Sequence, residues 1–287
     1  MFTLVLMLST LTLQAPAQAP FVAKQAYDKA TAHFEKNENP EALAEYDRAI
    51  ELDPTRADYF VGRARTLARL RRYDEAFDAY GRAVGLDPAD PMILRYRGHH
   101  YINVRKIDLA LADLEKAEAM KEDDFGIYYH LALAYYLKGE FSKAADAYAG
   151  CLRTATSDDD RVACYAWQYP SLVRAGREAE AKALLDRIRP GLDVSENESY
   201  LDRLLLFKGV RTEEEVAVQM STGPLEQSTV GYGLGLWHLL NGRPEKAREY
   251  FVKATSGDYW PAFGFVAAEV ELARMKQAPE DTEARGR

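Results

Sequence analysis

The sequence contains few of the residues that build disulfide-stapled domains or cysteine-based metal sites. Its 287 residues include two cysteines, Cys151 and Cys164. Two cysteines can form one bridge at most, so a disulfide framework is excluded. If the two helices that carry them pack together, a disulfide between Cys151 and Cys164 is geometrically feasible in an oxidising compartment. Two buried free thiols are an equal alternative.

Positive charge is also scarce. The chain has 37 lysines and arginines against 45 aspartates and glutamates, which gives a net charge of −8. Binding to a nucleic-acid backbone needs a basic surface, so we predict no nucleic-acid partner. The densest basic run, residues 63–72, lies beside no evident set of aromatic side chains on which bases could stack.

Catalytic and metal-binding patterns are missing as well. The sequence contains no Ser-His-Asp, Cys-His or nucleophile-elbow pattern, so we predict no catalytic residues and no enzyme activity. His99, His100 and His130 are the only candidates for a metal cluster, and they lack the spacing of a zinc site. We therefore predict no metal and no cofactor. A weak alternative places a metal between His99 and His130, which would lie on neighbouring helices.

One glycine-rich stretch, Gly231-Tyr-Gly233-Leu-Gly235, superficially matches a nucleotide-binding loop. No strand pattern precedes it and no phosphate-binding lysine follows it. We therefore assign its glycines to close packing between helices.

A long apolar run occurs only at the start of the chain. Residues 1–13 are almost wholly apolar, and small residues follow up to Ala19. This pattern predicts a signal peptide over residues 1–19, cleaved near Ala17 or Ala19, and a periplasmic or secreted protein. No basic residue precedes the run, and a cytoplasmic protein with an apolar N-terminal tail is the alternative. Later apolar stretches are shorter, so we expect no stable membrane span after signal cleavage.

What the sequence does contain is an internal repeat of 34 residues. Two series of small residues keep this step: Ala30, Ala64, Gly98, Ala132 and Ala42, Ala76, Ala110, Ala144. Apolar residues around both series have helical spacing, so each repeat predicts two helices. Small residues let an antiparallel pair approach closely, and a bulky replacement would cost about 1–3 kcal/mol. We predict that the second helix of each repeat is capped by Asn39, Asp74, Asp108 and Ser142.

The order of large, small, glycine, aromatic and alanine positions, with a closing proline, resembles the tetratricopeptide repeat. In the first three units Asn37, Arg71 and Arg105 replace the glycine of the turn. The resemblance implies an all-α fold, a right-handed superhelical α-solenoid of antiparallel helix pairs with a C-terminal capping helix.

The register of the repeat sets the expected organisation. Four regular units cover residues 23–158, and two degenerate helix pairs cover 159–222. Asp158, Asp159 and Asp160 are expected in an exposed loop between units. The last unit and the capping helix cover 228–275, and the charged tail 276–287 is expected to be disordered.

The resemblance also implies a concave groove, lined by the first helix of each unit, that binds extended peptides or partner helices. The matching positions are Tyr27, Thr31, Phe34, Val61, Arg65, Ala68, Arg69, Arg95, His99, Asn103, Tyr129, Leu133 and Tyr136. The Lys and Asn pair that clamps chaperone tails is absent, because Val61 and Arg65, then Arg95 and His99, hold those positions.

This groove is basic in its middle and aromatic towards its ends, which predicts an acidic partner segment. Arg65, Arg69 and Arg95 would pair with its carboxylates, and the tyrosines would supply apolar contacts. The alternative is that the arginines pair with neighbouring acids and that another face makes the contact.

These observations predict a non-catalytic scaffold or adaptor of the bacterial cell envelope with a protein or peptide partner. Two alternatives remain open. The chain could be a self-associating structural protein that forms homodimers, or a subunit that presents substrates to an envelope protease or transport complex.

Overall fold

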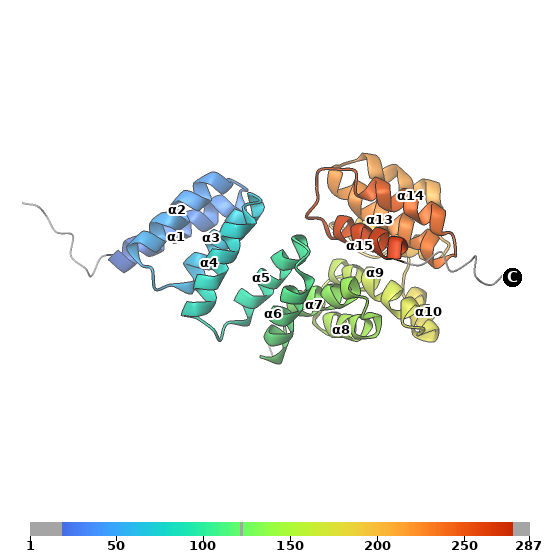
Figure 1. Ribbon diagram of the computed structural model, residues 1–287, viewed down its shortest axis with the longest axis horizontal. Helices are drawn as coiled ribbons and strands as arrows, with labels where there is room; N and C mark the ends of the chain where they lie inside the picture. Colours follow the sequence, from blue (N-terminus) through green and yellow to red (C-terminus); the bar gives the residue numbers. More distant parts are fainter. Residues whose placement is uncertain (1–18, 121–122, 278–287) are drawn as a thin grey trace, which may run out of the picture. The chain divides into compact units, whose positions relative to one another are not determined.

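The computed structural model describes residues 19–120 and 123–277, and all regular elements within these ranges are helical. The predicted all-α solenoid of helix pairs is confirmed there (Figure 1). The predicted signal peptide lies outside the described residues except for Ala19, which begins the first helix. The helices are α1 (Ala19–Glu35), α2 (Asn39–Leu52), α3 (Ala57–Arg69), α4 (Tyr73–Leu86), α5 (Pro91–Asn103), α6 (Ile107–Ala119), α7 (Phe125–Lys138), α8 (Phe141–Thr154), α9 (Asp158–Arg174), α10 (Glu178–Asp186), α11 (Glu198–Phe207), α12 (Glu213–Ala217), η1 (Val218–Ser221), α13 (Pro224–Leu240), α14 (Pro244–Ala254) and α15 (Phe263–Gln277).

The chain divides into two compact units, Met1–Ile93 and Leu94–Arg287. The boundary falls at the start of α5, inside the segment where four regular repeats are expected. Within the described ranges, no helix is both long enough and apolar enough to span a membrane.

The same turn ends the first helix of every helix pair. The first or second residue after the helix adopts positive φ, and paired backbone hydrogen bonds close the turn, as from Arg71 N to Ala68 O and from Arg72 N to Leu67 O. This is the Schellman arrangement, which satisfies the last carbonyl groups of the helix. The positive-φ residues are Asn37, Arg71, Arg105, Gly139, Gly176, Gly209 and Gly242. The replacement of the turn glycine in the first three units therefore leaves the turn itself unchanged.

The predicted caps of the second helices are wrong. The helices α4, α6 and α8 each begin one residue before the predicted cap, and α2 begins at the predicted cap Asn39 itself. In all four helices the residue that does occupy the N-cap position makes no side-chain hydrogen bond to the helix. The second helix begins directly after the positive-φ turn that ends the first helix. The cap residue's carbonyl accepts the first helical bond, as from Ala76 N to Arg72 O at 3.1 Å.

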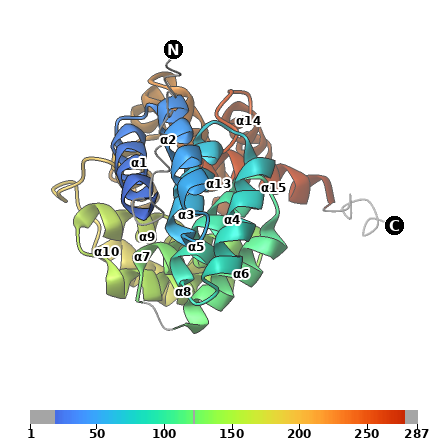
Figure 2. The ribbon, with the colours of Figure 1, turned by 90° about the vertical axis from the view of Figure 1, so that its left-hand side faces the viewer.

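In the first unit, α1 to α4 pack as neighbouring pairs, and α1 also contacts α3, as Figure 2 shows. Ala30 and Ala42 are fully buried and cluster with Phe34 and Tyr46. A Cβ added at Gly62 would lie 2.3 Å from the Tyr46 ring. The absence of a side chain at this position is therefore what lets α2 and α3 come together.

In the second unit the repeat pattern continues with larger variations. A Cβ at Gly98 would meet Leu114 at 2.7 Å, so Gly98 faces this leucine across the pair α5 and α6. A Cβ at Gly235 would meet Phe251 at 2.5 Å. The assignment of the Gly231–Gly235 stretch to helix packing is confirmed.

The run Asp158 to Asp160 is not a loop, as expected from the sequence, but the first turn of α9. Ser157 and Asp160 form a capping box, and carboxylates are stabilising at this end of a helix. Asp159 accepts backbone N–H groups of residues 195–197 at 2.9–3.0 Å. Burial acts to raise the pKa of Asp159, but these hydrogen bonds outweigh it and the pKa is lowered.

The C-terminal helix α15 packs against α13 and α14 and covers the last helix pair (Figure 1). It begins at Phe263 and extends through Lys276 and Gln277, two residues that were expected in a disordered tail. The rest of that tail lies outside the described residues.

Candidate peptide-binding faces

The predicted groove residues of the first unit come together on one face of α1 and α3. The Arg69 guanidinium carbon lies 3.4 Å from the centroid of the Phe34 ring, and that of Arg65 lies 4.8 Å from it. Arg69 also donates to the Phe34 carbonyl at 2.6 Å and to Asn37 Oδ1 at 3.1 Å. Burial, and then the positive charge of Arg65, lower the pKa of Arg69.

Aromatic rings continue this face along α1. Tyr27 stacks on Tyr59 with centroids 5.0 Å apart and meets Tyr46 edge-on at 5.8 Å. The Thr31 hydroxyl donates to the Tyr27 carbonyl at 3.0 Å. The face therefore combines two neighbouring guanidinium groups with the half-buried ring of Tyr27, whereas Phe34, Tyr46 and Tyr59 are buried beneath it.

In the second unit, by contrast, the predicted groove residues are covered by the chain's own C-terminal segment. Tyr129, Leu133 and Tyr136 are 7%, 0% and 0% exposed. The Phe263 ring lies 5.3 Å from the His99 ring and 6.3 Å from the Tyr129 ring. These residues do not line an open groove in this structure.

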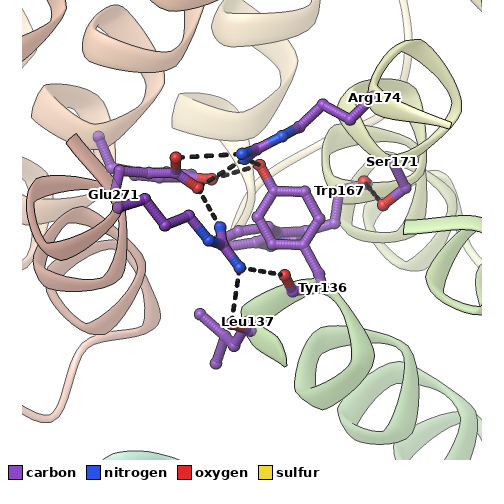
Figure 3. Close-up of polar contacts among 8 residues, drawn as sticks. Tyr136, Leu137, Trp167, Ser171, Arg174 and Glu271 are labelled. Atoms are coloured by element: carbon purple, nitrogen blue, oxygen red, sulfur yellow. Dashed lines mark hydrogen bonds and ion pairs between the residues drawn. The ribbon is translucent and has the colours of Figure 1, made fainter. Parts of the chain in front are cut away.

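A polar network fixes α15 over α7 and α9. Figure 3 shows the Glu271 carboxylate facing Arg174, with which it makes contacts of 2.5 and 3.2 Å. Arg274 donates to the same carboxylate at 2.6 Å and to the Leu137 carbonyl at 2.8 Å. The Glu271 side chain is 3% exposed, so this ion pair is part of the interior.

Two further contacts close the same surface. Asn103, which is 5% exposed, donates to the Pro261 carbonyl at 2.7 Å. Arg105 pairs with Glu269 at 2.7 Å and places its guanidinium over the Trp260 ring. Peptide binding by His99, Asn103, Tyr129, Leu133 and Tyr136 stays a prediction, and it would require the segment 260–274 to leave this surface.

Arg95, the third predicted carboxylate-binding arginine, has an internal partner. Its Nε atom lies 3.4 Å from Asp124 Oδ1, and its guanidinium lies over Gly126 at the start of α7. Arg95 therefore pairs with a neighbouring acid, as the alternative interpretation of the groove arginines predicted.

Cys151 at the end of α8 and Cys164 on α9 are joined as a disulfide, with their Cα atoms 6.4 Å apart. Both cysteines are fully buried. Each lies in the shared core of the second unit, so the bridge links two helices that already pack together.

The histidines at the predicted weak metal site are packed among aromatic rings. His99 and His130 have ring centroids 4.5 Å apart, and His130 Nδ1 bonds to the Gly126 carbonyl. Among residues 19–120 and 123–277 no group of three or more histidines, cysteines or acids is arranged to hold a metal.

One buried charge was missed from the sequence, that of Arg203 on α11. Its side chain is 2% exposed, and Nη2 donates to the Ala166 carbonyl at 2.8 Å. That carbonyl has no helical partner, because Pro170 lies four residues on and has no N–H group. The proline inside a helical pattern was the available signal that some other donor must reach Ala166.

Comparison with known proteins finds a family whose repeats match part of this chain. Residues 27–91 and 97–159 match the family model described as Tetratricopeptide repeat. No curated protein sequence matches the chain.

Solved structures share the fold at low sequence identity. PilF of Pseudomonas aeruginosa is 12% identical with a TM-score of 0.55, over 83% of this chain and 92% of PilF. PilW, described as a widely conserved type IV pilus biogenesis factor, is 14% identical with a TM-score of 0.53, over 82% and 93%. The Cut9–Hcn1 assembly of the APC/C is 16% identical with a TM-score of 0.56, over 89% of this chain and 43% of the other.

Proposed function

We propose that this chain, which is a tetratricopeptide repeat protein, is a non-catalytic scaffold of the cell envelope that binds an acidic partner segment on α1 and α3. Arrays of such repeats present extended surfaces for protein partners rather than a catalytic cleft. The proposal rests on the face formed by Arg65, Arg69 and Phe34 in the first unit.

The electrostatics of this face favour a carboxylate ligand. Two guanidinium groups lie against one phenyl ring, so each charge raises the energy of the other. A carboxylate placed between them would relieve that repulsion and gain charge-assisted hydrogen bonds, each worth about 1.5–3 kcal/mol. The half-buried ring of Tyr27 would add apolar contact.

The second unit also favours a partner site on the first unit, because its own groove positions are already covered. Its corresponding surface holds Phe263, Glu269 and Glu271 of the chain itself. An aromatic ring and two carboxylates therefore already occupy it, which is the chemistry predicted for a partner segment. The first unit is the place where such a segment could bind without displacing part of the core.

Three observations support an envelope location. Residues 1–19 have the composition of an export signal. A disulfide joins Cys151 and Cys164, and disulfides persist in oxidising compartments. PilW, which shares the fold, is described as a pilus biogenesis factor. Deleting residues 1–19 should then abolish export in cell fractionation, and export that persists would contradict the proposal.

The partner site is tested by the double variant Arg65→Gln/Arg69→Gln used as bait in an envelope extract. Arg48→Gln/Arg72→Gln is the matched control, because it removes two positive charges of the same unit, one on α2 and one at the residue that precedes α4. We expect wild type and control to retain a common partner at 0.15 M salt and the Arg65/Arg69 variant to lose it. Equal recovery by all three baits would contradict the proposed face, and recovery of this chain alone would favour self-association.

A further inference from the structure

The interior of the second unit contains a cation surrounded by aromatic rings. The guanidinium carbon of Arg203 lies 5.0 Å from the ring centroid of Trp167, 4.8 Å from that of Tyr200 and 5.9 Å from that of Tyr232. Cation–π contacts of this kind stabilise the folded state, and they are stronger when desolvated. In the part of the chain that the structure describes, Arg203 forms no ion pair with an aspartate or glutamate, although its side chain is 2% exposed.

Several features of the sequence accommodate this charge. Pro170 leaves the Ala166 carbonyl free to accept from Arg203 Nη2. A Cβ at Gly233 would lie 2.7 Å from Arg203 Cδ, so the glycine lets the aliphatic part of the side chain cross α13. A proline, a glycine and three aromatic rings thus accommodate the side chain of one buried arginine.

The hydrogen-bonding needs of the site are not met by these contacts. Arg203 Nε and Nη1, Trp167 Nε1 and the Tyr148 hydroxyl are buried and have no hydrogen-bond partner among the described residues. The ring faces stabilise the flat side of the guanidinium, whereas its N–H bonds lie in its plane and need acceptors at its edges. Each unsatisfied buried donor destabilises the folded state, and a charged donor does so most.

The groups concerned are all able to donate, and they lie within one cluster. Trp167 is in contact with Arg203 and belongs to the same buried core as Tyr148. The charge of Arg203 opposes the rise in the pKa of Tyr148 that burial causes. Tyr200, which packs on the guanidinium, is only half-buried. Donors around a single positive charge are the arrangement that stabilises one negative charge.

We propose that Arg203, Trp167 and Tyr148 bind a small monovalent anion, a halide or a small carboxylate, inside the second unit. One positive charge matches one negative charge, and a divalent anion would leave a net charge buried. The indole N–H and the tyrosine hydroxyl complete a set of donors that either a halide or a carboxylate can accept. This site is independent of the partner face on α1 and α3.

The test is the melting temperature of the full chain in sodium chloride, sodium formate and sodium gluconate at constant sodium concentration and ionic strength. A ligand that binds only the folded state raises stability with the logarithm of its concentration. Above the dissociation constant, we expect each tenfold increase in chloride or formate to raise Tm by about 3 °C relative to gluconate. The chloride and formate arms distinguish a halide site from a carboxylate site.

The variant Arg203→Met removes the charge and should abolish the difference between chloride or formate and gluconate. Arg105→Met is the matched control, since it removes one arginine of the same unit that already pairs with Glu269. If Arg203→Met does not fold, Trp167→Phe keeps an aromatic ring and removes the Nε1 donor. It should weaken anion binding about tenfold, seen as a shift of the Tm curve to tenfold higher anion concentration.

Two results would overturn the proposal. Identical Tm values in all three salts for the wild type would show that no anion binds and that water satisfies these donors. An anion effect of equal size in wild type and in the variants at Arg203 or Trp167 would place the binding elsewhere.

Discussion

At the scale of single residues, the stability of this chain depends on backbone groups that special residues leave without a partner. Pro170 frees the Ala166 carbonyl inside α9, and Arg203 of α11 satisfies it. Stability also depends on the residue at each positive-φ turn, because glycine adopts this conformation without strain whereas other residues incur a cost of about 1–2 kcal/mol.

The link between Pro170 and Arg203 predicts a coupled pair of substitutions. Arg203→Met alone leaves the Ala166 carbonyl buried and unpaired, whereas Pro170→Ala supplies a helical N–H group for it. We therefore expect Arg203→Met to cost at least about 1 kcal/mol more in the wild-type background than in the Pro170→Ala background. Urea denaturation of the four proteins measures this difference. Strictly additive effects would show that the two residues act independently.

Replacing glycine by alanine should change the free energy of unfolding in opposite directions at a turn and on a helix. Gly176 has φ of +72° and Gly81 lies on the exposed face of α4, and a Cβ at either position would meet nothing within 4 Å. Gly176→Ala should lower the free energy of unfolding by about 1 kcal/mol, because alanine is strained at positive φ. Gly81→Ala should raise it by about 0.5–1 kcal/mol, because alanine favours the helix. Urea denaturation separates the two signs, and a destabilised Gly81→Ala variant would mean that this surface is not open.

At the scale of helices, the sequence pattern predicts the repeat well because small residues, turns and helical spacing all recur every 34 residues. Ala30 and Ala42 are buried at the predicted seam, and Asn37, Arg71 and Arg105 form the predicted turns. The starts of the second helices were not predicted, since the turn geometry rather than a cap side chain determines them.

The candidate site was predicted in part, for a related reason. Arg65 and Arg69 share one face because they are four apart on one helix, which is a local property that the sequence contains. The burial of Tyr129 and Tyr136 depends on Phe263 and Glu271, more than 120 residues later. Nothing local indicates that contact, so the pattern alone could not predict that α15 covers these positions.

The packing of α7 against α5 and the C-terminal segment predicts a pH dependence. Burial, and then the charge of Arg95, lower the pKa of His130 to about 3, against about 6.5 in an unfolded chain. Between these values the unfolded state binds a proton that the folded state excludes, so stability is lost as the pH falls below about 6.5. From pH 7 to pH 5 we expect a loss of about 2 kcal/mol, at up to about 1.4 kcal/mol per pH unit.

Urea denaturation at both pH values measures this loss, and the His130→Phe variant is the control. It keeps an aromatic ring beside His99 and Phe263 and removes the titrating group. An unchanged pH dependence in His130→Phe would assign the effect to other groups.

The disulfide predicts the redox state of the two cysteines. Cys151 and Cys164 are joined across α8 and α9. Thiol counting on the denatured protein, isolated from the envelope, should find no free thiols without reductant and two with it. Two free thiols before reduction would contradict both the bridge and the oxidising compartment that supports the export proposal.

At the scale of the whole molecule, the two units differ in which surface they leave for a partner. The second unit covers its groove positions with residues 260–274, through Phe263, Glu269 and Glu271. The first unit holds Arg65 and Arg69 on a face that carries aromatic surface and, within the described ranges, no ion pair of Arg69. We therefore propose that a partner binds the first unit and that the groove positions of the second unit have a structural role.

Hydrogen–deuterium exchange of the full chain with and without its partner tests this assignment most directly. We predict that the partner slows exchange in residues 23–37 and 57–72 and leaves residues 95–136 and 260–274 unchanged. Slower exchange in 95–136 together with faster exchange in 260–274 would contradict the account, because it would show the partner replacing the C-terminal segment in the second unit.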